Sequence, residues 1–228
     1  MKIALISDIH SNLFYFEKVL HEIEKENVDD IYCLGDLVGY YDKPNEVIDL
    51  IKKKDIKCIK GNHDKYVLCE INYDLKKDEI YRIKRHRELL RTENLEFLKN
   101  LKEMIILEIN NKKICMTHSL PNNCEGYIYN FDSLDKNFLK KFDYYFFGHT
   151  HIPIIGYHYG SCIVNPGSVG QPRDFTKQSS FVIVDFELQD VKIRKVSQNV
   201  NLFTKKLENE KYSVQLIDIL KRGRNEKN

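Results

Sequence analysis

The N-terminal part of the chain alternates short apolar runs with amphipathic stretches. Three apolar runs have the length of buried strands: residues 2–7, 31–34 and 56–59. A first helix is expected over residues 13–25, where apolar side chains recur on one face at Phe16, Val19, Leu20 and Ile23. Asn12 suits the N-cap of this helix, and Pro44 suits the first turn of a second one. The strand–helix–strand order predicts parallel strands covered by helices.

The remainder of the chain is less regular and richer in strand patterns. Residues 66–102 are polar and helical in character, with Thr92 placed to cap a helix that ends near Leu101. One helix is expected over residues 202–220, followed by a frayed tail at 221–228. The other expected strands are residues 104–109, 113–117, 144–147, 161–164, 180–186 and 191–196. This order predicts a single α/β domain over residues 1–228, in which a second sheet packs on the first.

Composition narrows the class of protein. Of 228 residues, 42% are hydrophobic and 31% are charged, which is typical of a globular chain and not of a disordered one. Lys and Arg number 36 against 34 Asp and Glu, so the net charge of +2 disfavours a protein that coats nucleic acid or binds an anionic membrane. No apolar run approaches the roughly 18–20 residues of a membrane helix. The N-terminal apolar run is too short for a signal peptide, and six cysteines stand singly, so we expect a reducing, cytoplasmic setting.

Polar side chains able to bind metals stand where the expected strands end. In parallel α/β sheets these ends face one crevice, so five distant segments are expected to meet there. Each segment alone is a weak signal, and His21, His86 and His158 have no such pattern and are interpreted as ordinary histidines. The segments contribute three Asp, one Asn and five His: Asp8-Ile9-His10, Gly35-Asp36, Gly61-Asn62-His63-Asp64, Thr117-His118 and Gly148-His149-Thr150-His151.

These residue types suit a pair of divalent cations. Mixed oxygen and nitrogen ligands are accepted by Mn²⁺, Fe²⁺ and Zn²⁺, and one carboxylate can bridge two ions. Two dications with only two carboxylate ligands leave excess positive charge, which attracts phosphate. Water shared between the ions becomes a nucleophile at neutral pH.

The five segments, in this order, resemble the calcineurin-like metallophosphoesterase superfamily. Residues 8–13, 35–40 and 165–174 are similar to its small bacterial and archaeal phosphodiesterase branch. The resemblance implies a four-layer αββα sandwich, with two mixed β-sheets flanked by helices. It also implies hydrolysis of small phosphodiesters, in which a metal-bridging hydroxide attacks phosphorus.

The roles of individual residues follow from the resemblance by position. His63 would protonate the leaving alkoxide as general acid. Asp64 would orient the turn that carries His63, with a purely local turn role left open. The 165–174 loop is either structural or brings Arg173 to a phosphate oxygen. The implied metal ligands are Asp8, His10 and His151 for the first ion, Asn62, His118 and His149 for the second, and Asp36 between them.

Two departures from the superfamily bear on activity. Its protein phosphatases carry Gly-Asp-x-x-Asp-Arg-Gly, whereas this chain has Gly35-Asp36-Leu37-Val38-Gly39-Tyr40. An acidic partner for the catalytic His and a phosphate-binding Arg are both absent there, which argues against phosphoprotein substrates. Ser119 also follows His118 where the family often has Gly.

Several interpretations remain open beside the phosphodiesterase. A dinucleoside polyphosphate hydrolase, a phosphomonoesterase and a nuclease share these motifs, although the near-neutral charge disfavours nucleic acid. A non-catalytic protein-binding scaffold is disfavoured because His63 and all seven ligands are present. Mn²⁺ is the expected ion, with Fe²⁺, Ni²⁺ and Zn²⁺ as alternatives. No membrane partner is expected, and a homo-oligomer is left open. Residues 66–101, rich in Lys, Arg and Tyr, are expected mostly as solvated helices on the rim, with a roof over the cleft as the alternative.

Overall fold

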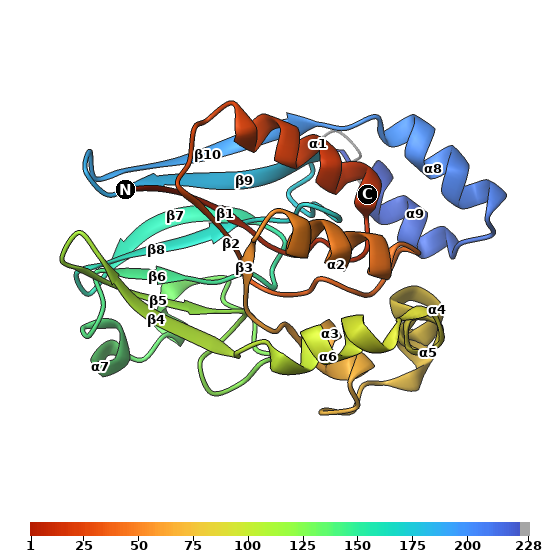
Figure 1. The fold of residues 1–228 in the computed structure, drawn as a ribbon, viewed down its shortest axis with the longest axis horizontal. Helices are drawn as coiled ribbons and strands as arrows, with labels where there is room; N and C mark the ends of the chain where they lie inside the picture. The colour runs from red at the N-terminus through yellow and green to blue at the C-terminus, as the bar shows by residue number, and fades with distance from the viewer. Residues whose placement is uncertain (224–228) are drawn as a thin grey trace.

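The computed structural model describes residues 1–223 and contains two five-stranded mixed sheets that pack face to face (Figure 1). The predicted fold class is thereby confirmed. In strand order, the first sheet consists of β10 (Asp190–Ser197), β9 (Gln178–Asp185), β1 (Lys2–Ile6), β2 (Asp30–Cys33) and β3 (Lys57–Cys58). The second consists of β4 (Met104–Ile109), β5 (Lys112–Thr117), β6 (Tyr144–Phe146), β8 (Ser161–Pro166) and β7 (Pro153–His158).

Parallel pairs occupy one side of the first sheet, β1 to β3, and the centre of the second, as the strand–helix–strand order predicts for the N-terminal strands. β1 pairs in parallel with β2, and β6 in parallel with both β5 and β8, whereas β9, β10, β4 and β7 pair antiparallel. The core between the sheets includes Leu5 and Leu34 from the first sheet and Met116, Phe146 and Val164 from the second. The functional consequence is that several parallel strands end at the same edge of the sandwich.

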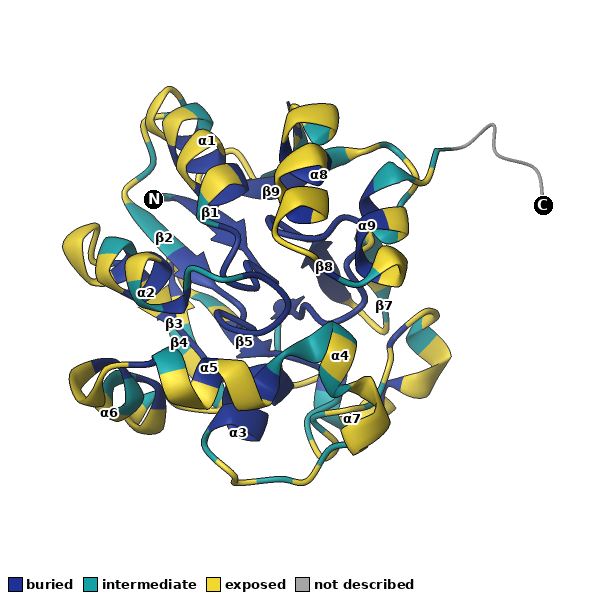
Figure 2. Cartoon of the chain, turned by 90° about the vertical axis from the view of Figure 1, so that its right-hand side faces the viewer, coloured by how far each residue is buried: buried dark blue, intermediate teal, exposed yellow. Residues whose placement is uncertain are grey.

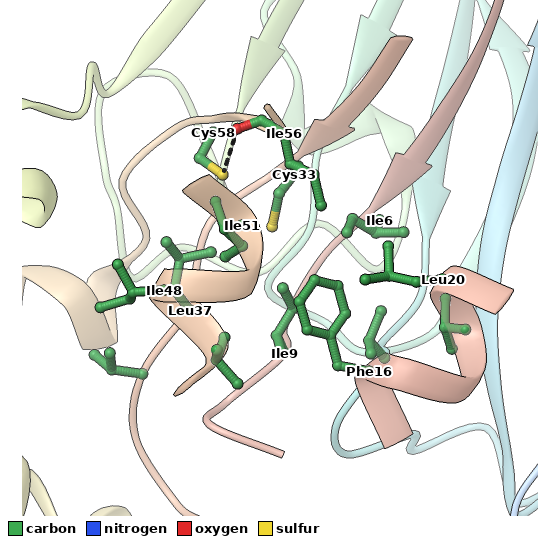
Figure 3. Packing of buried hydrophobic residues seen from close by; sticks show 14 of the residues in the cluster. Ile6, Ile9, Phe16, Leu20, Cys33, Leu37, Ile48, Ile51, Ile56 and Cys58 are labelled. Atoms are coloured by element: carbon green, nitrogen blue, oxygen red, sulfur yellow. Dashed lines mark hydrogen bonds between the residues drawn. The ribbon is translucent and has the colours of Figure 1, made fainter. Parts of the chain in front are cut away.

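Helices cover the outer face of the first sheet. Phe16 and Leu20 of α1 (Leu13–Glu24) and Ile48 and Ile51 of α2 (Pro44–Lys53) pack on it (Figure 3). Asn12 caps α1 by accepting a hydrogen bond from the backbone N–H of Tyr15, at 3.1 Å. The other helices before β4 are α3 (Asn62–Val67), α4 (Asp78–Tyr81), α5 (Ile83–Leu89) and α6 (Thr92–Asn100).

The outer layer on the second sheet is thinner. It consists of the chain between β5 and β6, with only the short helix α7 (Lys136–Leu139) and a turn of 3₁₀ helix (Phe131–Ser133). Ile128, Leu134 and Leu139 pack from this layer onto the sheet. None of the helices within residues 1–223 combines the length and apolarity needed to cross a membrane.

Three details differ from the expectations. β7 was not predicted, because Pro153 and Gly156 interrupt its apolar pattern. The helix expected over 202–220 is two helices, α8 (Val200–Asn209) and α9 (Val214–Lys221), and the expected tail lies outside the described residues from 224 onward. Thr92 is the first residue of α6 and not its cap.

Candidate dinuclear metal centre

All seven predicted ligands and His63 are buried together where the strands of both sheets end. Figure 2 looks onto this edge, where buried loops lie inside a ring of partly exposed helices. Several of the residues adopt left-handed backbone angles that side chains other than glycine rarely take, with φ between 51° and 67°. Strain of this kind gathers at functional sites, where the surrounding fold holds it. The strained residues are Asp8, His10, Asp36, His149 and His151.

The first group of ligands joins the loop after β1 to the loop after β6. The Asp8 Oδ2 atom accepts a hydrogen bond from the backbone N–H of His149 at 3.1 Å. The other carboxylate oxygen, Oδ1, has no hydrogen-bond partner and lies 3.3 Å from His151 Nε2 and 3.8 Å from His10 Nε2. One oxygen is thus fixed by the backbone, and the other faces two imidazole nitrogens.

The second group joins the loop after β3 to the ends of β5 and β6. The Asn62 side-chain oxygen lies 3.0 Å from His118 Nε2. His149 Nε2 is buried without a hydrogen-bond partner, and ligand atoms of His118, His149 and Asp36 all lie within 4.8 Å of one another. These three side chains are therefore close enough to share one ion.

Asp36 stands between the two groups. Its Oδ1 atom accepts a hydrogen bond from the backbone N–H of His63 at 2.8 Å. Its Oδ2 atom lies 3.6 Å from His10 Nε2 and 3.4 Å from His118 Nε2, so one oxygen faces a histidine of each group. This is the position that a bridging carboxylate occupies between two cations.

The tautomers of the histidines test whether these groups fit cations. The Nδ1 atoms of His10, His118 and His151 lie 2.7–2.9 Å from the backbone carbonyl oxygens of Val38, Leu34 and Gln171. A carbonyl only accepts, so each Nδ1 carries a proton and Nε2 is the atom left to face a metal ion, as a free lone pair in neutral His10 and His151. His10 Nε2 and His151 Nε2 then face each other at 3.2 Å as two acceptors. A cation between them removes this repulsion, so the residues fit a metal ion.

The pKa values of the clustered side chains also favour a metal site. Burial lowers the pKa of His10 to about 4 and that of His149 to about 3, which keeps both rings neutral and able to donate a lone pair. Burial acts to raise the pKa of Asp36, but the imidazoles of His118 and His63 lower it well below its usual range. Burial also opposes protonation of His118, yet the Asp36 carboxylate raises the pKa of His118 to about 9. A metal ion bound there therefore replaces a proton.

His63 lies beside the two groups of proposed ligands, and its Nδ1 atom makes no hydrogen bond to a carboxylate. That atom is buried without a hydrogen-bond partner and packs against Gly39. Gly39 has a φ of +94°, and a Cβ added to it would lie 2.4 Å from His63 Nδ1. The rings of Tyr40, Tyr66 and Tyr81 enclose His63, with centroids 4.5–5.4 Å from its own. Packing replaces the acidic partner that the sequence lacks.

Asp64 lies beneath the site and binds only backbone. Its two carboxylate oxygens accept hydrogen bonds from the N–H groups of Asp36, Leu37, Val38 and Gly61, at 2.9–3.2 Å. Burial raises the pKa of Asp64 to about 7, and the N–H donors from Gly61 and Val38 oppose the shift. Asp64 thereby joins the loop that carries Asp36 to the loop that carries Asn62 and His63.

A cavity of about 170 Å³ opens onto the clustered Asp, Asn and His side chains. Arg173 lines it and donates from Nη2 to the Tyr40 hydroxyl at 3.0 Å and to the Gln171 side-chain oxygen at 2.9 Å. The 165–174 loop also closes the base of the site, because the Ser168 hydroxyl donates to the Asp8 carbonyl at 2.8 Å. The cleft therefore holds a guanidinium near the metal ligands.

Several lining residues were not identified from the sequence. Tyr66, Lys77 and Tyr81 come from the polar segment 66–102, most of whose other residues are exposed. Glu125 and Tyr127 come from the chain between β5 and β6. None of these follows a strand end, so the strand-end pattern that finds the ligands does not find them.

The histidines outside the pattern lie outside the clusters. His86 is buried, accepts from the backbone N–H of Gly39 at 3.1 Å, and lies 2.6 Å from the Tyr41 carbonyl oxygen. His21 is in the last turn of α1, and His158 lies at the far end of β7. His86 is thus a core histidine with both ring nitrogens satisfied.

Two His–Asp clusters that share a carboxylate, on a sandwich of two mixed sheets, define a class of metal-dependent phosphoesterases. The sequence model of the calcineurin-like phosphoesterase superfamily domain matches residues 1–189, and the chain belongs to this superfamily. A protein of uncharacterised function from Methanocaldococcus jannaschii is 35% identical over 210 residues, which cover 84% of this chain and 86% of the relative.

Solved structures share the fold over almost the whole chain. A metallophosphoesterase from Sphaerobacter thermophilus is 27% identical, with a TM-score of 0.78 over 98% of this chain and 99% of that one. A hypothetical protein from Pyrococcus horikoshii is 22% identical, with a TM-score of 0.83 over 97% and 98% of the two chains.

Proposed function

We propose that the protein hydrolyses small phosphodiesters with the help of two divalent cations. The observation that carries the proposal is the position of Asp36, whose Oδ2 atom faces His10 in one ligand group and His118 in the other. Asp8, His10 and His151 would hold the first cation, and Asn62, His118 and His149 the second. The cations supply Lewis acidity toward phosphate oxygens and acidify water at the site.

His63 is suited to move a proton to the leaving group. It shares the cleft with the metal ligands, and three tyrosine rings limit its motion. Burial lowers the pKa of His63 well below its usual range, whereas the neighbouring Asp36 carboxylate opposes that shift. A bound phosphate adds negative charge beside the ring and so favours the protonated imidazole that a general acid requires.

The side chains that surround the proposed cations add little further positive charge, which suits a diester. Among the described lining residues, Arg173 and Lys77 are the only arginine or lysine side chains, and Glu125 adds a carboxylate. Arg173 is already engaged with Tyr40 and Gln171, which leaves part of its fork for a phosphate oxygen. A monoanionic phosphodiester needs less compensating charge than a dianionic monoester. The mixed ligand set of Asp, Asn and His suits Mn²⁺, with Fe²⁺, Ni²⁺ and Zn²⁺ as alternatives.

A substrate panel on metal-loaded protein tests the proposal. It compares bis(4-nitrophenyl) phosphate, 4-nitrophenyl phosphate, 2′,3′- and 3′,5′-cyclic nucleotides and a dinucleoside polyphosphate. We expect Mn²⁺-dependent hydrolysis of the diesters. His63→Ala should lose about 10²–10⁴-fold in kcat on the cyclic nucleotides, whose leaving group is an alkoxide, and less on bis(4-nitrophenyl) phosphate, with little change on His158→Ala as the matched control. Faster hydrolysis of the monoester or the polyphosphate would assign a different substrate class. Absence of metal-dependent hydrolysis across the panel would contradict the proposal and favour a non-catalytic scaffold.

A further inference from the structure

Two exposed tyrosine rings extend from the metal cluster toward solvent. The ring of Tyr127 lies on His149, with centroids 4.3 Å apart and planes inclined by 34°. Tyr129 stacks on Tyr127, with centroids 5.3 Å apart and planes nearly parallel at 3°. Tyr127 is 45% exposed and lines the cleft, and Tyr129 is 64% exposed. The column of His149, Tyr127 and Tyr129 is continuous from a predicted metal ligand to the surface.

The segment that carries these rings is held in place. Ile128, between the two tyrosines, is 3% exposed and packs against the second sheet, which anchors the backbone that carries both rings. The preceding turn is closed by Asn123, whose side-chain oxygen accepts from the backbone N–H of Glu125 at 3.0 Å. The Glu125 carboxylate accepts a hydrogen bond from the Tyr66 hydroxyl of α3. The rings are therefore fixed beside the cleft and not free on a loose loop.

Neither the fold nor the metal chemistry requires this pair of rings. Both are largely outside the core, and no hydrogen bond of either hydroxyl is recorded among the described residues. The rings around His63 come from a different set of residues, Tyr40, Tyr66 and Tyr81. Tyr127 contacts His149 instead, and no ring contact joins it to His63 among the described residues, although both line the same cleft.

We propose that Tyr127 and Tyr129 form a stacking platform for a flat aromatic group on the ester that the substrate retains after cleavage. A nucleobase and a simple aryl ring share this chemistry, since each offers a planar π-face to a tyrosine. The inference rests on the proposed function, because it assigns the substrate class of the same site. It adds that the phosphodiester carries an aromatic group on the side that His63 does not face.

Substrates that share the same leaving group but differ in the retained group test the platform. Benzyl 4-nitrophenyl phosphate and cyclohexylmethyl 4-nitrophenyl phosphate both release 4-nitrophenolate, and they differ in whether the retained ring is flat or puckered. We expect kcat/KM to favour the benzyl ester by about 3- to 10-fold, since aromatic pairing adds to simple burial. Thymidine 5′-(4-nitrophenyl) phosphate is the third arm, and a rate above that of the benzyl ester assigns the platform to a nucleobase.

Substitutions of the two tyrosines distinguish the effect of an aromatic ring from the effect of side-chain size. Tyr127→Leu and Tyr129→Leu should each bring the benzyl preference close to 1, whereas Tyr127→Phe and Tyr129→Phe should keep it. Tyr159→Leu is the matched control, because Tyr159 is 43% exposed at the β7–β8 turn, away from the cleft lining. Equal rates for the two esters in the wild type, or a preference that survives both Leu variants, would overturn the platform.

Product binding separates this inference from the proposed function. Calorimetric titration of the Mn²⁺-loaded protein with benzyl phosphate and with cyclohexylmethyl phosphate should show the same preference and the same loss in the Leu variants. If neither ester is hydrolysed but benzyl phosphate still binds more tightly through the tyrosines, the platform stands and the phosphodiesterase fails. If both esters are hydrolysed at equal rates and bound equally, the platform fails and the phosphodiesterase stands.

Discussion

Substitution of Gly39 by alanine is expected to displace His63 without touching a metal ligand. The added Cβ would lie 2.4 Å from His63 Nδ1 and 3.1 Å from its Cγ, whereas unstrained contacts lie near 3.5–4.0 Å, so the ring must move by roughly 1 Å. The tyrosine rings around His63 leave it little room elsewhere. A misplacement of about 1 Å can lower kcat by about 100-fold.

Gly160 provides the control for the backbone strain in this variant. Its φ of +92° matches the +94° of Gly39, but a Cβ there meets nothing within 4 Å. Both alanine variants should lose about 1–2 kcal/mol of stability to the left-handed backbone, seen as a fall of about 2–8 °C in Tm. Only Gly39→Ala should lose kcat at unchanged metal content, and the loss should be larger for an alkoxide leaving group than for 4-nitrophenolate. Wild-type kcat in Gly39→Ala, or equal loss in Gly160→Ala, would refute the argument that packing positions His63.

Three further predictions follow from single side chains. Asp64→Asn should lower the free energy of unfolding by about 2–6 kcal/mol in urea titrations, because two backbone N–H donors then face an amide NH₂ group; an unchanged midpoint would contradict this. Burial lowers the pKa of His86 from 6.5 to about 3, so the unfolded state binds the extra proton and stability is lost as pH falls through this window. From pH 7.5 to 5.5 the wild type should lose about 1.3 kcal/mol more than His86→Gln, and parallel pH profiles would count against it. Arg173→Ala should raise KM or lower kcat with metal content intact, and unchanged kinetics would show that Arg173 does not contact phosphate.

The central strands were predictable because their signal is local. β1 and β2 are short apolar runs, and Asn12 and Pro44 mark the starts of α1 and α2. The sequence pattern does not predict β7, because this antiparallel edge strand tolerates proline and glycine and its alternating pattern is weak. The sequence predicts one continuous helix over residues 202–220, because the break between α8 and α9 carries no proline or glycine to mark it.

The clustering of the proposed metal ligands was predictable for a topological reason. Parallel strands end at one edge, so side chains that follow them must meet, as Asp8, Asp36 and His118 do. The rest of the cleft depends on how loops fold over that edge. Tyr127 and Glu125 reach it only because Ile128 packs on the second sheet, and Tyr66 and Tyr81 reach it through the course of the segment 66–102. These placements depend on tertiary packing and produce no recognisable spacing pattern in the sequence.

The number of metal ions bound per chain tests the central claim most directly. The chain, stripped with chelator, reloaded with Mn²⁺ and freed of excess ion, should retain two ions by elemental analysis. His118→Ala should retain one, and His158→Ala, outside both ligand groups, should retain two. A wild-type chain that holds no ion, or a His118→Ala chain that holds as many ions as the wild type, would contradict the account of two cations sharing Asp36.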